Sequence, residues 1–189
     1  MKCIKEKSSL KYNSRIIAIN LNPMKKILFL YILITFNISC NIKSGNGFVN
    51  ESDLSFHMGS DNAVELFKSF DSAWKNLDYN LMKTMIADSI SFEFQDGKVA
   101  TNSQEFIDLV KKEVEKENES GNNYSWTTDF AFSVYLNPKS GGEWVTAGFT
   151  SNLDNPEDGV IKKEYNEWYF FNKENKLELW YQTIRKVKE

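Results

Sequence analysis

Five carboxylates in the C-terminal half of the sequence could serve as a catalytic acid or base. They are Asp129, Glu143, Glu164, Glu167 and Glu178. Each falls in a segment where apolar and polar residues alternate, and the simplest reading of that pattern is a solvated side chain on the outer face of a strand. We expect that outward orientation for all five. Proton transfer would need one of them next to the substrate, with a second group that donates to developing negative charge.

The sequence offers little else that could carry acid–base, metal or nucleophilic chemistry. The only histidine, His57, falls in a stretch of small and polar residues and is expected to be solvated. Both cysteines, Cys3 and Cys40, precede the expected domain, which leaves it without a disulfide or a thiolate metal site. There is no Gly-rich phosphate loop, no nucleophile-elbow serine and no metal-ligand spacing. We therefore expect no metal and no cofactor, and the catalytic residues stay unassigned.

Aromatic residues are the most distinctive binding groups. The candidate ligand-binding residues are Trp74, Trp126, Trp144, Tyr165, Trp168, Trp180 and Gln182. If several tryptophans face a cavity, they would suit an apolar, aromatic or sugar-like ligand, to which Tyr165 or Gln182 could hydrogen bond. Each tryptophan is equally explained by the core or by a sheet-to-sheet dimer contact. The unbroken apolar runs 168–171 and 179–181 indicate burial on both faces of their strands, which a cavity and an oligomer interface would together provide.

The charge balance argues against a nucleic-acid partner. Residues 1–39 hold seven of the 23 Lys and Arg residues and one of the 26 Asp and Glu residues, so the chain from Cys40 onward has 16 basic and 25 acidic residues. A domain this acidic repels a phosphate backbone.

The N-terminal region resembles a bacterial export signal. Met24 and two lysines precede ten apolar residues, Ile27–Phe36, and then Ser39 and Cys40. Ten apolar residues are about half of the roughly 20 needed to span a bilayer. The closing residues resemble a lipobox, so we expect Cys40 to be lipidated and the protein to be anchored in the cell envelope, facing the periplasm or the surface. An ordinary cleaved signal and a buried strand are the alternatives, and metabolic labelling with palmitate would separate them.

These features divide the chain into four parts. Residues 1–23 are expected to be a gene-model extension, 24–40 the signal peptide, 41–59 a flexible tether, and 60–189 one folded domain.

Hydrophobic periodicity within 60–189 predicts an α+β fold. Apolar residues spaced by three and four predict a helix over 63–77 with Ser60 or Asp61 as its cap, and a short helix follows Asp78. A strand is expected over 90–94. A third helix begins near 101–103 with a Thr101/Gln104 capping box, and its charged far side, 111–119, is expected to be solvated. Alternation predicts a strand over 126–136, and the turns and loop that follow delimit further strands over 143–153, 160–171 and 177–187.

This order resembles the nuclear transport factor 2-like superfamily and its SnoaL-like members. The resemblance covers about Asp61 to Lys186, and it rests on Ala73-Trp74, Leu77-Asp78-Tyr79, the passage from Ile86-Ala87-Asp88 to Phe92, and the hairpin from Trp168 to Gln182. It implies a cone-shaped barrel, with about three N-terminal helices packed on a strongly curved, mainly antiparallel sheet around a pocket. Such proteins include isomerases, dehydratases and cyclases as well as non-catalytic binding and dimerising modules, so the fold alone does not settle the function.

The sequence favours a tethered binding or interaction module with an aromatic-lined pocket, with an apolar or aromatic small molecule and a second copy of the chain as possible partners. The alternative is a SnoaL-like dehydratase, isomerase or hydrolase that uses a pocket carboxylate with Tyr165 or Tyr181. A third reading is an accessory protein of a surface complex without a ligand. A buried carboxylate in the cavity would favour the enzyme, and an all-apolar cavity would count against it.

Overall fold

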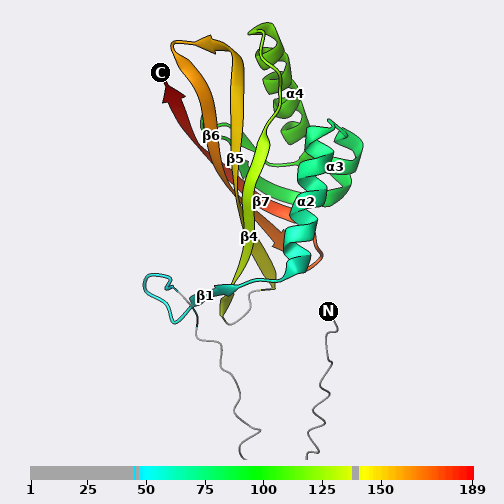
Figure 1. Ribbon diagram of the computed structural model, residues 1–189. Coiled ribbons are helices and arrows are strands. Elements are labelled where there is room, and N and C mark those ends of the chain that lie inside the picture. The colour runs from blue at the N-terminus through cyan, green and yellow to red at the C-terminus, as the bar shows by residue number, and fades with distance from the viewer. Residues whose placement is uncertain (1–44, 46, 138–140) are drawn as a thin grey trace, which may run out of the picture. The chain divides into compact units, whose positions relative to one another are not determined.

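The computed structural model describes residues 45, 47–137 and 141–189. These residues form three helices and one seven-stranded sheet, with the helices packed on one face of the curved sheet (Figure 1). The expected α+β class, with helices on a mainly antiparallel curved sheet, is confirmed. The expected signal peptide and Cys40 lie outside the described residues, so lipidation and envelope localisation stay predictions.

The first two helices begin at the caps that the sequence offers. In α2 (Asp61–Lys75), the Ser60 hydroxyl accepts a hydrogen bond from the backbone N–H of Ala63. In α3 (Tyr79–Met85), the Asp78 carboxylate accepts one from the N–H of Leu81. The buried residues of α2 recur at the predicted spacing and form one stripe facing the sheet. They are Ala63, Phe67, Phe70, Ala73 and Trp74.

The cap of the third helix differs by one residue from the prediction. Helix α4 (Ser103–Glu119) is capped by Asn102, whose side chain accepts from the N–H of Glu105 at 3.0 Å. The Glu105 carboxylate in turn accepts from the N–H of Thr101 at 2.8 Å. The predicted Thr101/Gln104 capping box was therefore wrong by one residue. Asparagine is as strong an N-cap as threonine or stronger, and Asn102, the residue after Thr101, takes that position.

The sheet has the order β1-β4-β5-β6-β7-β2-β3. Its strands are β1 (Ser55–Met58), β2 (Ile86–Glu93), β3 (Val99–Ala100), β4 (Thr127–Asn137), β5 (Gly142–Glu157), β6 (Val160–Asn172) and β7 (Leu177–Lys188). All neighbours are antiparallel except β2 and β7. Strand β2 starts earlier than predicted, and β5 runs through the expected loop to a tight hairpin at Asp158 and Gly159, both of which have positive φ.

Strand β1 corrects the predicted tether. Residues 55–58 fall inside the stretch 41–59, yet they pair with β4, with His57 opposite Tyr135. His57 is only 8% exposed, its imidazole stacks on the ring of Tyr135 at 5.2 Å, and it shares a hydrogen bond with Ser55. The expectation of a solvated histidine was therefore wrong, because pairing with a distant strand is not visible in local periodicity.

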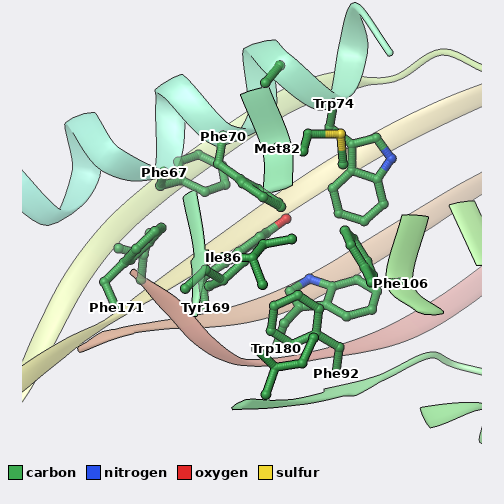
Figure 2. Close-up of a cluster of buried hydrophobic side chains, with 14 of the residues drawn as sticks. Phe67, Phe70, Trp74, Met82, Ile86, Phe92, Phe106, Tyr169, Phe171 and Trp180 are labelled. Atoms are coloured by element: carbon green, nitrogen blue, oxygen red, sulfur yellow. The ribbon is translucent and has the colours of Figure 1, made fainter. Parts of the chain in front are cut away.

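One aromatic core joins the helices to the sheet. Figure 2 shows Phe67, Phe70 and Trp74 of α2 above Tyr169 and Phe171 of β6 and Trp180 of β7. The Phe106 ring of α4 lies edge-on to Trp74 at 5.1 Å and to Phe92 of β2 at 4.9 Å. Such arrangements stabilise a core beyond the area that they bury. This core holds the inner face of the sheet at a fixed distance from α2 and α4.

Candidate functional site

A cavity of about 80 Å³ opens between the inner face of the sheet and helices α2 and α4. Its aromatic lining comprises Trp74, Phe94, Tyr124, Trp126, Phe149, Tyr165 and Tyr169. Its acidic lining comprises Asp71, Glu113, Glu117 and Glu167, and its other polar residues include Gln95, Asn123, Ser125, Ser151 and Gln182. A largely aromatic hollow with convergent polar groups is the usual form of a small-molecule site.

Glu167 is the most unusual residue of this lining. It lies on β6 between Ala147 of β5 and Gln182 of β7, and it is only 6% exposed. Its Oε2 accepts hydrogen bonds from the Tyr169 hydroxyl and from Trp180 Nε1, the latter at 2.9 Å. Its Oε1 accepts one from Gln182 Nε2 at 2.6 Å. A carboxylate can accept about four hydrogen bonds, so Oε1 keeps capacity for a further donor.

The strand register explains why this carboxylate points inward. Tyr165, Glu167, Tyr169 and Phe171 alternate along β6 and share the inner face, while Trp168 and Phe170 lie between them on the outer face. The small side chain of Ala147 stands beside Glu167 on the neighbouring strand. The expectation that Glu167 points to solvent was therefore wrong.

Burial raises the pKa of Glu167, because a low-dielectric setting disfavours the charged form. The hydrogen bonds from Tyr169, Gln182 and Trp180 act in the opposite direction but do not cancel the effect of burial. Glu167 takes part in no ion pair within the part of the chain that the structure describes. A buried carboxyl with a raised pKa and no cation beside it is a candidate proton donor and acceptor.

Two tyrosine hydroxyls of the lining have unused hydrogen-bonding capacity. Tyr124 accepts a hydrogen bond from Trp74 Nε1 at 3.1 Å but donates to no acceptor among the described residues. Tyr165 makes no hydrogen bond to any of these residues. Burial raises the pKa of both phenols, and the charge of Glu167 raises them further. Both hydroxyls therefore remain protonated at neutral pH and can donate to an oxygen in the cavity.

Asp71 fixes one aromatic wall. Its Oδ1 accepts from Trp126 Nε1 at 2.9 Å, and its Oδ2 accepts from the Thr128 hydroxyl and from Lys75 Nζ, both at 2.8 Å. The Lys75 ammonium also lies over the Trp126 ring, 5.8 Å from its centroid. This network holds the Trp126 indole in place, and it leaves Asp71 neutralised by Lys75.

The fold is similar to known structures at low sequence identity. A nuclear transport factor 2-like protein of unknown function from Cytophaga hutchinsonii is 10% identical, with 65% of this chain and 89% of that chain covered and a TM-score of 0.44. Another from Burkholderia xenovorans is 11% identical, with 68% and 87% covered and a TM-score of 0.47. An epoxide hydrolase from M. tuberculosis is 9% identical, with 67% and 84% covered and a TM-score of 0.44.

No protein-family model and no curated protein matches the sequence. The structure is similar to solved structures of nuclear transport factor 2-like proteins. A shared fold of this kind does not determine a shared activity. What the cavity can do therefore follows from its own residues.

The structure brings together only some of the residues that the sequence suggested. Trp74, Trp126, Tyr165 and Gln182 line the cavity, and Trp180 lies buried behind Glu167. Trp144 and Trp168 do not reach the cavity. They lie on the outer face of the sheet, because they follow the opposite parity to Val145 and Glu167 on their strands.

Four of the five candidate carboxylates take no part in the cavity. Glu164 pairs with Lys162 and Arg185, and Asp129 accepts from the Thr150 hydroxyl. The expected solvated orientation was also wrong for Glu143, which has the same parity as the buried Val145 and accepts from the backbone N–H and hydroxyl of Ser60 at the start of α2. Glu178 accepts from Asn172. The described residues contain no group of three or more His, Cys, Asp or Glu side chains arranged to hold a metal ion. Within the same residues, no helix has the length and apolar character to cross a membrane.

The predicted site did not include Asp71, Tyr124 or Glu113 of the lining. Asp71 and Glu113 lie on helices, where a single carboxylate has no distinguishing context. Tyr124 lies in the segment between α4 and β4, for which no regular structure was predicted. The two-residue parity of a strand groups Tyr165, Glu167 and Tyr169 on one face, but the unbroken aromatic run 168–171 does not show which face is the inner one.

Proposed function

We propose that this domain binds a small organic molecule in the cavity and that Glu167 exchanges a proton with it. The observation that carries the proposal is Glu167 itself, a buried carboxyl in a cavity wall with a raised pKa and no cationic partner among the described residues. An all-apolar cavity would favour a binding module without chemistry. A carboxyl buried at a free-energy cost inside a cavity favours a catalytic role.

The surrounding groups suit proton abstraction next to a carbonyl. In the ionised form, Glu167 accepts the proton of a substrate C–H bond, the electrons of that bond form a carbon–carbon double bond, and the π electrons of the carbonyl move onto its oxygen. The hydroxyl of Tyr165 or Tyr124 can donate to this oxygen as its negative charge develops. Glu167 then returns the proton to another carbon or to a leaving hydroxyl. Isomerisation and dehydration are thus the reaction classes that we propose.

Deuterium exchange tests this proposal. In D2O, the protein is expected to catalyse incorporation of deuterium next to the carbonyl of a substrate drawn from a panel of small ketones and aldehydes, read by mass spectrometry. Glu167→Gln should slow the exchange by about 10²–10⁴-fold, the usual contribution of a positioned base.

Glu164→Gln is the matched control. It makes the same chemical change on the same strand, outside the cavity, and should leave the exchange rate unchanged. Exchange at the wild-type rate in Glu167→Gln would rule out the proposed base. Native mass spectrometry of protein from its own host can identify the substrate directly.

We also propose that the outer face of the sheet pairs with a second copy of the chain. Phe132, Thr146, Trp168 and Tyr181 stand side by side across four strands, and Val134, Trp144, Phe170 and Leu179 form the adjacent row. Both rows are free of charged residues, and the exposed fractions of Phe130, Phe132 and Tyr181 are 47%, 41% and 38%. Two copies of one uncharged patch can meet about a twofold axis without burying a charge.

Sedimentation measurements check the dimer. We expect wild type to sediment as a dimer at micromolar concentration and Phe132→Asp as a monomer, because a carboxylate cannot be buried in the apolar contact. Val99→Asp is the control, since Val99 is 51% exposed on β3, at the far edge of the sheet. A monomeric wild type would refute this interface.

A further inference from the structure

All the charged side chains that line the cavity are acidic. Its lining contains four carboxylates and, among the described residues, no Lys or Arg. Three of the carboxylates have a lysine partner that lies outside the lining. These pairs are Asp71 with Lys75 at 2.8 Å, Glu113 with Lys98 at 3.7 Å, and Glu117 with Lys163. Glu167 receives only neutral donors, so its charge has no counterion in this part of the structure.

Three aromatic side chains that line the same cavity pack edge to face. The rings of Trp74 and Trp126 lie 6.1 Å apart at 79°, and those of Tyr124 and Trp126 lie 5.5 Å apart at 86°. Hydrogen bonds hold both indoles, from Trp74 to Tyr124 and from Trp126 to Asp71. The three rings are therefore fixed at roughly right angles, and each contributes part of the cavity wall.

The Trp126 ring already receives a cation. The Lys75 ammonium sits 5.8 Å from its centroid, within the range of a cation–π contact. Lys75 is not part of the lining, so its ammonium does not occupy the cavity, and the contact shows that the π surface of this indole accepts a cation.

We infer that the molecule bound in this cavity is an organic cation, with an ammonium or quaternary nitrogen attached to a small apolar group. This inference rests on the proposed binding function and specifies its ligand class. A cation would supply the missing counterion of Glu167 and would lie against the faces of Trp126 and Trp74. An anionic ligand would meet carboxylates without a basic residue in the lining. A volume of about 80 Å³ suits a compact cationic group rather than a large ring system.

A pair of probes with the same shape and different charge tests the inference. The probes are choline and its neutral carbon analogue, 3,3-dimethylbutan-1-ol, with 3,3-dimethylbutanoate as the anion. Binding to the full protein is measured by calorimetry and by tryptophan fluorescence. We expect choline to bind at least tenfold more tightly than the alcohol, and the butanoate to show no binding.

Two variants should remove this preference by different routes. Glu167→Gln takes away the uncompensated charge, and Trp126→Leu takes away the π face while keeping an apolar wall. Each should lower the affinity for choline about tenfold or more and leave that for the alcohol unchanged. The matched controls, Glu164→Gln and Trp144→Leu, lie outside the cavity and should retain the preference.

Three results would overturn the inference. They are equal or tighter binding of the alcohol, binding of the butanoate, and no binding of choline. None of these results would refute the proposed proton transfer, because the deuterium-exchange test depends on Glu167 and not on the charge of the substrate. Loss of exchange dependence on Glu167, with choline still preferred, would instead refute the catalytic proposal and leave a cation-binding module.

Discussion

Replacing Glu167 with glutamine is expected to stabilise the protein at pH 8 and to leave its stability nearly unchanged at pH 4.5. Burial raises the pKa of Glu167 above the ordinary value of 4.5, so the folded protein holds this proton at a pH where the unfolded chain has released it. The contribution of Glu167 to stability is therefore complete below pH 4.5 and is lost as the pH rises through the folded-state pKa. Within that window the free energy of unfolding falls by about 1.4 kcal/mol per pH unit.

The glutamine variant does not lose stability in this way as the pH rises, because its side chain has no proton to release. Its Oε1 can still accept from Tyr169 and Trp180, and rotation of the Gln182 amide can satisfy its Nε2. Urea unfolding of both proteins from pH 4.5 to 8.5 measures the difference. Burial raises the pKa of the neighbouring Tyr169 well above its ordinary value, so this phenol stays protonated in both proteins over that pH range.

Glu164→Gln serves as a control with the opposite sign. Hydrogen bonds from Lys162 and Arg185 hold the pKa of Glu164 below its usual value, so its stabilising effect is present at neutral pH and is lost as the pH falls. Its variant should therefore be no more stable than wild type at pH 8. If Glu167→Gln were destabilised at pH 8 as at pH 4.5, Glu167 would be a structural hydrogen-bond acceptor rather than a poised acid.

The helices of this fold could be predicted from sequence because their signals are local. The stripe that includes Phe67, Phe70 and Trp74 repeats every three or four residues, and Ser60 and Asp78 offer hydroxyl and carboxylate caps. Of the four long strands, β4 could be predicted from alternation, and β5, β6 and β7 from the turn residues that separate them. Strand β1 could not, because it is held by pairing with β4, which lies far away in the sequence, and β3 has only two residues and therefore no periodicity.

The site was harder to predict for a different physical reason. Residues 168–171 are aromatic without interruption, so nothing in β6 marks which parity faces the helices. A one-residue change of parity would place Trp168 in the cavity and Glu167 in solvent, which is what the sequence suggested. Helix packing determines which parity of β6 faces inward. Helices α2 and α4 cover one face of the sheet only (Figure 1), and the centroid of the Tyr169 ring lies 5.0 Å from that of Phe67.

Truncation of Trp180 is expected to be among the most damaging single changes in the domain. The side chain is 1% exposed and its ring contacts those of Trp74, Phe92, Phe94 and Phe106. Trp180→Ala should cost about 3–5 kcal/mol, as large-to-small changes of buried aromatic residues do. That is a large share of the 5–15 kcal/mol that ordinarily separates folded from unfolded domains.

Trp144→Ala is the control for Trp180→Ala, because it removes a tryptophan from the other face of the sheet. Trp144 is only partly buried on the outer face, against Phe170, Trp168 and Tyr181, so its loss should cost about 1–2 kcal/mol in the monomer. Thermal and urea unfolding measure both variants. Equal losses would place the two tryptophans in equivalent packing, contrary to the inner and outer assignment made here.

Trp180→Phe separates the packing role of this residue from its polar one. Phenylalanine keeps much of the ring volume but has no N–H, so Glu167 loses one of its three donors. Loss of a donor to the charged form raises the pKa of the carboxyl further. The stability of Trp180→Phe should therefore lie closest to wild type at pH 4.5, where only packing is lost, and should fall away from it as the pH rises. Combined with Glu167→Gln, the same change should show no such dependence on pH, because the charge that Trp180 stabilises is gone.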